Sequence, residues 1–272
     1  PSVMRLRAAS PTTSRQKTSV IMVWKPGGCS HIDTYDPKPN AGTEYRGPFG
    51  TIGTKIPGVR FTELLPKQAA IADKFTVLRS MHQTAGGHPA GSMQLLSGDS
   101  DTRDKPKPRL PDWMTVANYL RAQEETTRTN PLPRYVGVNM SNEYIGPAYI
   151  GETYSPFSVT GDPNAPNFVV PNIGLTDSRE VERLSRRIDL RQKLDTMTRA
   201  FDQYGELGAL DEFETQAMTL LTNPQTKRAF DISEEDDATR DRYGRNTWGQ
   251  QLLLARRLAE AGVEVLTSSL RG

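Results

Sequence analysis

The sequence predicts an α/β fold built on a mostly parallel sheet. Short apolar runs typical of buried strands alternate along the chain with longer stretches of helical periodicity, a pattern typical of parallel strands joined by covering helices. The first apolar run, Val20–Trp24, ends in the glycine pair Gly27 and Gly28, and polar residues follow at once. In open sheets of this kind, ligand-binding groups collect beyond the carboxyl ends of the strands. The fold class therefore also predicts the location of a site.

The elements of the first half follow in order after this strand. A helical run from 63 to 74 leads to a second strand predicted at Thr76–Arg79. Asp112 is a good N-cap for the helix predicted to follow it, because its carboxylate can accept hydrogen bonds from the first free N–H groups. A third strand is predicted at Tyr135–Val138, where aromatic and β-branched residues dominate.

The second half is less regular and then ends in a strong helix and strand. Residues 139–172 are rich in glycine and proline, and we expect an irregular excursion that acts as a substrate lid or as a structural wrap. Residues 176–245 favour charged helices whose apolar positions are more typical of packing than of a cofactor site. A helix is predicted over 246–261, and Gly262 ends it. The strand predicted at Val263–Thr267 is apolar on both faces, which indicates a central position in the sheet.

Composition argues against several classes of protein. The chain has 34 Lys and Arg against 32 Asp and Glu, without a basic tract interleaved with aromatics, so no nucleic-acid partner is expected. No apolar run approaches the roughly 20 residues that span a bilayer, so no membrane span is expected. The single cysteine, Cys29, excludes an internal disulfide and a zinc site of several cysteines. Residues 1–18 are rich in Ser, Thr and basic residues, and we expect a disordered leader there.

Two groups of chemically active side chains follow predicted strands. Ser30, His31, Asp33 and Asp36 come directly after the first strand, and the region 79–99, which contains the other two histidines, follows the second. Parallel strands would bring both groups to one edge of the sheet, where imidazoles act as metal ligands or as acids and bases near neutral pH. The structural alternatives are that the aspartates stabilise the turn and that each histidine is an ordinary surface or core residue.

Several motifs resemble the bacterial family known as domain of unknown function 1501. They are the stretches 27–39 and 45–82, the segment AFDISEE, and the segment RYGRNTWGQQLLLARRLAEAGVEV. The resemblance runs from about Ser19 to the end of the chain. That family is similar in fold to the alkaline phosphatase and sulfatase superfamily. The resemblance therefore implies a three-layer α/β/α sandwich with a mostly parallel sheet, alkaline-phosphatase-like and incomplete at its C-terminus.

The resemblance also implies a metal centre at the carboxyl edge of the sheet, with one or two divalent cations such as zinc or calcium. It makes Asp33 the first choice of metal ligand, with Ser30, His31 and Asp36 as further candidates. Residues 84–98 loosely resemble the segment that carries the nucleophile in sulfatases, which makes Thr84 a candidate. The Cys/Ser-x-Pro-x-Arg pattern of sulfatases is missing from this sequence, so formylglycine chemistry is not expected.

The function implied by the resemblance is metal-assisted hydrolysis of a phosphate or sulfate ester. His82 or His88 would orient or protonate the leaving group, and Arg79 would pair with the anionic ester through its planar guanidinium. A structural ion pair is the alternative role of Arg79. The alternative function is a non-catalytic exported protein that keeps the fold and binds a polysaccharide or a cell-surface partner.

The resemblance has two further implications for the whole protein. Relatives usually begin with a twin-arginine export signal, which implies a periplasmic or secreted protein. They also continue beyond the last strand with motifs that include aspartate and histidine. Residues 19–272 are therefore expected to be the N-terminal portion of one domain, with the remaining C-terminal part as their partner. Alone, this portion is expected to bind metal weakly, to lack esterase activity and to be poorly soluble.

Overall fold

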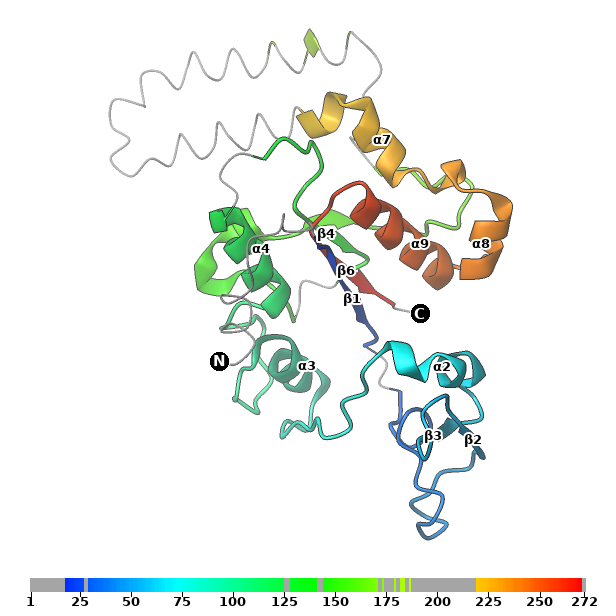
Figure 1. Ribbon diagram of the computed structural model, residues 1–272. Helices are drawn as coiled ribbons and strands as arrows, with labels where there is room; N and C mark the ends of the chain where they lie inside the picture. Colours follow the sequence, from blue (N-terminus) through cyan, green and yellow to red (C-terminus); the bar gives the residue numbers. More distant parts are fainter. Residues whose placement is uncertain are drawn as a thin grey trace, which may run out of the picture.

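The centre of the protein is a parallel four-stranded sheet with the strand order β1-β6-β4-β5 (Figure 1). Its strands are β1 (Val20–Trp24), β4 (Tyr135–Val138), β5 (Phe157–Val159) and β6 (Val265–Ser269). The predicted α/β class with a mostly parallel sheet is thereby confirmed, as is the central position of the last strand, which pairs with β1 and β4. This computed structural model describes residues 18–26, 29–124, 128–140, 144–170, 173, 179, 182–183, 186 and 219–270.

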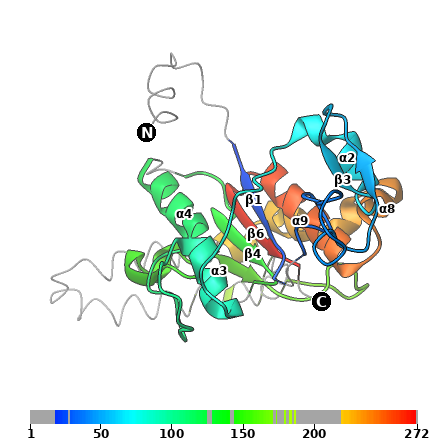
Figure 2. The same ribbon diagram turned by 90° about the horizontal axis from the view of Figure 1, so that it is seen from below.

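Helices pack on both faces of this sheet. Leu266 of β6 faces the core that contains α9 (Thr247–Glu260), whereas the preceding residue, Val265, faces the core that contains α4 (Trp113–Glu124). The helix α3 (His88–Ser97) lies on the same side as α4, and Figure 2 shows the sheet between these two helices and α9. Successive side chains of β6 therefore point to opposite faces of the sheet. Only hydroxyls two residues apart in this strand can lie on the same face.

Local sequence sets both ends of α9, and the stop at Gly262 was predicted. The Asn246 side chain accepts a hydrogen bond of 2.9 Å from the N–H of Gly249 and caps the helix. Gly262 follows the helix with a φ of +95°, a conformation that other residues adopt only with strain. Three shorter elements precede α9 on its side of the sheet: α7 (Pro224–Phe230), η4 (Ile232–Glu234) and α8 (Asp237–Tyr243).

Gly249 allows α9 to approach the end of α8 closely. A Cβ at this position would overlap the carbonyl oxygens of Tyr243 and Gly244, which are backbone atoms and cannot swing away. We therefore expect Gly249→Ala to lower the free energy of unfolding by about 2–3 kcal/mol, although alanine is the better helix former. Gly53→Ala is the matched control, because nothing lies within 4 Å of its added Cβ. Equal urea midpoints for the two variants would contradict this packing.

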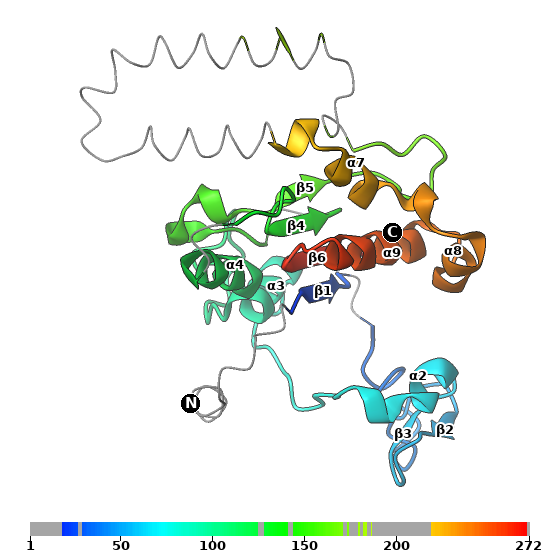
Figure 3. The ribbon, with the colours of Figure 1, turned by 45° about the horizontal axis from the view of Figure 1, so that its top comes forward.

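Residues 29–79 form a small lobe beside the sheet, which we call the hairpin lobe. Its own core contains Phe61, against whose ring Tyr35 packs edge-on with centroids 5.2 Å apart, and Phe75 stacks on the same ring at 6.2 Å. Figure 3 shows the lobe apart from the parallel sheet. Its elements are the antiparallel pair β2 (Thr51–Gly53) and β3 (Arg60–Thr62), the helix α2 (Pro66–Ala70) and the turn η1 (Ala72–Lys74).

The strand predicted at Thr76–Arg79 is wrong. Phe75, just before this segment, is extended, but the segment belongs to neither sheet. Apolar and polar residues alternate in this segment because Phe75 and Val77 both pack against the core of the hairpin lobe. His82 and His88 therefore do not follow a strand of the parallel sheet, which removes the reason for expecting them at its carboxyl edge.

The other differences from the predicted elements are smaller. The last strand begins two residues later than predicted, at Val265, because the N–H of Val263 still donates to the carbonyl of Leu258 in α9 at 2.9 Å. The expected irregular stretch 139–172 contains β5 and two single turns, η2 (Ala148–Ile150) and η3 (Glu152–Tyr154). The predicted leader up to Lys17, and most of the helical segment predicted at 176–245, lie outside the described residues.

Candidate functional site

The carboxyl edge of the sheet carries a hydrogen-bond network centred on Gln251, a buried residue of α9. Its amide nitrogen lies 2.8 Å from the carbonyl oxygen of Ser269, 2.9 Å from Oγ of Ser268 and 3.3 Å from the carbonyl oxygen of Val138. Its amide oxygen accepts a hydrogen bond of 2.9 Å from Nδ2 of Asn139. We call these contacts the edge network. One side chain thus joins the ends of β4 and β6.

Asn139 holds a strained backbone conformation within this network. Its φ is +52°, in the left-handed region that asparagine tolerates better than most residues. The side chain fixes the conformation by exchanging two hydrogen bonds with Gly161, of 2.8 Å to its carbonyl and 2.9 Å from its N–H. The N–H of Asn139 donates to the carbonyl of Val159 at 2.8 Å. Strained residues held in this way are frequent at ligand sites.

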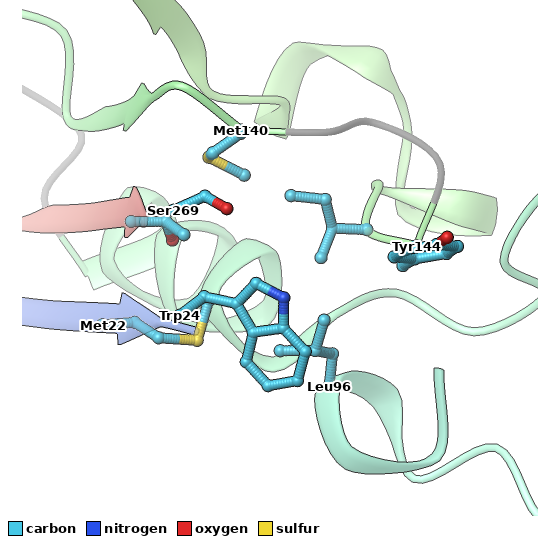
Figure 4. A pocket seen from close by; sticks show the side chains of 8 residues that line it. Met22, Trp24, Leu96, Met140, Tyr144 and Ser269 are labelled. Atoms are coloured by element: carbon cyan, nitrogen blue, oxygen red, sulfur yellow. The ribbon is translucent and has the colours of Figure 1, made fainter. Parts of the chain in front are cut away.

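A small cavity lies on the other face of the same edge, towards α3. Its enclosed space has room for about one water molecule, and we call it the Ser269 pocket. Ser269 is 2% exposed, and its Oγ has no hydrogen-bond partner in the described part of the chain. Figure 4 shows several of the lining side chains around the space. They are Met22, Trp24, Leu96, Met140, Tyr144, Ile145, Thr267 and Ser269.

The second hydroxyl of the Ser269 pocket is already paired. Oγ1 of Thr267 and the phenol oxygen of Tyr135 are 3.0 Å apart. Burial raises the pKa of Tyr135 far above its ordinary value of 10.0, so this phenol stays neutral. The pair is a neutral hydrogen bond within the core. The Ser269 hydroxyl, by contrast, has no hydrogen-bond partner in the described part of the chain.

Asp112 supports the loop that lines this pocket, in addition to capping α4 as predicted. Its carboxylate accepts hydrogen bonds from the N–H groups of Met114 and Thr115, both at 3.0 Å, and from the N–H of Gly146 at 3.1 Å. Tyr144 and Ile145 of that loop face the cavity. Burial is the largest influence on the carboxyl and raises the pKa of Asp112, although these hydrogen bonds oppose it.

The raised pKa of Asp112 predicts the sign of its pH dependence. Because the folded protein binds this proton more tightly than the unfolded chain, the contribution of Asp112 to stability is present below the ordinary pKa of 3.8 and is lost as pH rises through the folded pKa. Asp112→Asn cannot titrate. We therefore expect the unfolding free energy of the wild type, relative to this variant, to fall as pH rises from about 3. Urea unfolding at several pH values tests this, and a relative gain by the wild type would contradict it.

Asp33 is a partly buried carboxylate of the hairpin lobe. The hydroxyl of Thr62 donates to its carbonyl oxygen at 2.9 Å, and the N–H of Thr62 donates to the carbonyl of Thr34 at 3.0 Å, so the turn is docked on β3. Oδ1 of Asp33 is buried without a hydrogen-bond partner in the described part of the chain. It packs against Gly47, where a Cβ would lie 2.6 Å from this oxygen. An unpaired buried carboxylate oxygen is costly and needs an explanation such as a missing ion.

Asp36 and Arg79 are brought together, and each is already engaged. Asp36 lies 3.5 Å from the Arg79 guanidinium through Oδ1 and 2.7 Å from the Lys38 ammonium through Oδ2. Arg79 also donates to the carbonyl of Tyr35 at 2.6 Å and to the carbonyl of Arg60 at 3.3 Å. These contacts favour the structural alternative for Arg79, because they close the turn that carries Asp33.

The remaining candidates are exposed: Ser30, His31, His82, Thr84 and His88. Thr84 is tied to α3, since its N–H donates to Oε1 of Gln94 at 3.0 Å and its hydroxyl accepts from Nε2 at 3.0 Å. Within the described ranges, no hydrogen bond or ion pair joins His82 or His88 to the Asp33 turn. Nor does this part of the chain contain a group of three His, Cys, Asp or Glu side chains placed to hold a metal.

Neither the edge network nor the Ser269 pocket was predicted from the sequence. Asn139 directly follows the strand that was predicted at Tyr135–Val138, so the rule that selected Asp33 also applied to it. Gln251 gives no such signal, because it stands beside a second buried glutamine in an amphipathic helix. Its role depends on a contact across 112 residues of sequence.

None of the helices in the described part of the chain is long and apolar enough to cross a membrane. Among known families, residues 17–272 match the one described as "Protein of unknown function (DUF1501)". No curated protein and no solved structure matches the chain.

Proposed function

The chain belongs to the DUF1501 family, and we propose that the full-length protein is an exported hydrolase that uses a divalent metal to cleave phosphate or sulfate monoesters. The observation that carries this proposal is the buried, unpaired Oδ1 of Asp33 in the turn that follows β1. We further propose the three-layer α/β/α sandwich of the alkaline phosphatase and sulfatase superfamily. Helices on both faces of a parallel sheet support this finer assignment.

The residue types of the Asp33 turn are ones that bind divalent cations such as zinc or calcium, although the described residues include no group of three His, Cys, Asp or Glu placed around a metal. Asp33 offers an anionic oxygen that no hydrogen bond uses, and His31 and Ser30 add an exposed imidazole and hydroxyl two and three residues earlier. We assign Asp36 and Arg79 the task of fixing this turn through their ion pair. When bound, the cation would polarise the ester oxygens and lower the pKa of the attacking water or hydroxyl.

The other proposed roles belong to exposed side chains around α3. His82 or His88 would donate a proton to the leaving group, since neutral imidazole exchanges protons near neutral pH. Thr84 is the candidate nucleophile, and the Gln94 amide orients its hydroxyl. These roles require the region 79–88 to approach the Asp33 turn in the substrate complex.

The test is an assay of the full-length protein with zinc, calcium or manganese, using 4-nitrophenyl phosphate and 4-nitrophenyl sulfate as substrates. We expect turnover with at least one metal, its loss in EDTA and its loss in Asp33→Asn. Asp237→Asn is the matched control, because that carboxylate is 89% exposed on α8. Metal binding without turnover of either ester would overturn the hydrolase proposal and support the alternative, an exported protein that binds a polysaccharide or a cell-surface partner.

A further inference from the structure

We propose that residues 42–49 form a flap that closes over the Asp33 carboxylate and must open before a divalent cation can bind to Oδ1. The inference rests on the proposed function, because it concerns access to the same candidate ligand. Oδ1 of Asp33 has no hydrogen-bond partner in the described part of the chain, yet this oxygen is buried. A cation that arrives from solvent therefore cannot reach it while the flap is closed.

Gly47 is the flap residue that covers this oxygen. A Cβ added to Gly47 would lie 2.6 Å from Oδ1 of Asp33 and 3.8 Å from Cδ1 of Ile32. A bound cation lies about 2.0–2.6 Å from its oxygen ligand, so the Gly47 backbone leaves no room for one on this side. The φ of Gly47 is +74°, which glycine adopts without strain, and the absence of a side chain allows the close approach.

The rest of the flap is weakly attached. Among residues 42–50, all of which the structure describes, Gly47 alone is not exposed. The N–H groups of Tyr45 and Arg46 both donate to the carbonyl of Gly42, which is a local turn. Within the described ranges, no hydrogen bond joins residues 42–49 to another segment. An exposed segment with so few contacts opens at a low cost in free energy.

Glu63 holds the C-terminal end of the flap. The N–H of Gly50 donates to Oε1 of Glu63 at 3.0 Å, and the N–H of Glu63 donates to the carbonyl of Gly50 at 2.9 Å. The second bond joins two backbones beside the β2–β3 pair, whereas the first depends on the carboxylate of an exposed residue. We therefore assign Glu63 as a positioning residue that sets how readily the flap opens.

The first test needs no metal, because trypsin cuts after Arg46 only when the flap has left its closed position. The rate of this cut reports the open population. We expect Glu63→Ala to raise the rate about three- to tenfold, the effect of losing one hydrogen bond. Glu63→Gln should be cut like the wild type, because its amide oxygen still accepts from Gly50. Mass spectrometry identifies the fragment, and an unchanged rate in Glu63→Ala would overturn the flap without removing Asp33 as a candidate ligand.

The second test follows the kinetics of zinc binding to the full-length protein by rapid mixing with a fluorescent indicator of free zinc. When opening limits binding, the observed rate levels off at the opening rate as the zinc concentration rises. We expect this plateau in the wild type and a plateau about three- to tenfold higher in Glu63→Ala. Gly47→Ala should show no plateau, because its Cβ would overlap Oδ1 of Asp33 and hold the flap away.

Gly58→Ala is the matched control and should keep the plateau of the wild type. Its φ of +79° is close to that of Gly47, but nothing lies within 4 Å of its added Cβ. Equal kinetics in the wild type and Gly47→Ala would overturn the inference, as would an absence of zinc binding in every variant. A plateau without turnover of either ester would overturn the proposed hydrolase and support the flap, so the two failures are distinguishable.

Discussion

Gln251→Leu should lower the free energy of unfolding by about 3–5 kcal/mol. Leucine fills a similar volume but removes the Gln251 amide from the buried carbonyl oxygens of Val138 and Ser269 and from the buried hydroxyl of Ser268. Each unsatisfied buried group costs about 1–3 kcal/mol, and some of that cost is relieved by water or relaxation. Unfolding in urea, followed by circular dichroism, measures the effect.

The control for this variant is Gln225→Leu. Gln225 is exposed in the first turn of α7, and a surface substitution of this kind changes stability by about 0.5 kcal/mol or less. If Gln251→Leu cost no more than Gln225→Leu, the edge network would not hold the ends of β4 and β6 together.

Asp33→Asn should weaken the binding of divalent metal to the full-length protein by at least about 100-fold. Even the loss of a group that only supports a metal ligand costs 10- to 100-fold in affinity, and Asp33 is proposed to be a ligand itself. The same substitution should not destabilise the metal-free protein, because it replaces an unpaired buried carboxylate with a neutral group of the same shape. Calorimetric titration with zinc, calcium and manganese measures the affinity.

Asp36→Asn separates a ligand from a supporting residue. Its carboxylate is paired with Arg79 and Lys38, so its loss should reduce the stability of the hairpin lobe and change metal affinity less than Asp33→Asn does. Equal metal affinity in the wild type and Asp33→Asn would exclude Asp33 as a ligand. A larger loss in Asp36→Asn would move the site to that carboxylate.

The parts of the fold that the sequence predicted are those determined by neighbouring residues. β1 and β4 are short runs of mostly apolar residues, and both have the predicted bounds. The glycine after α9 acts within one turn of helix. Asp112 was recognised for the same reason, although its bond to Gly146 across the loop was not.

The failures arise where distant residues decide the structure. Val77 and its neighbours alternate like a strand, but the core of the hairpin lobe satisfies their apolar side chains without a ladder. The candidate site likewise depends on contacts between residues that are distant in the sequence. Asp33 was selected because it follows a strand, whereas its unpaired oxygen depends on the approach of Gly47. Gln251 meets Asn139 only in the folded chain, so no local pattern reveals the pair.

The most direct test of the central claim is a crystal structure of the full-length protein grown with manganese or zinc, with the metal located by its anomalous scattering. The account predicts an anomalous peak about 2.0–2.2 Å from Oδ1 of Asp33, which is a bonding distance for zinc, and close to that for manganese. A peak bonded to other residues, with Oδ1 of Asp33 still unpaired, would contradict it.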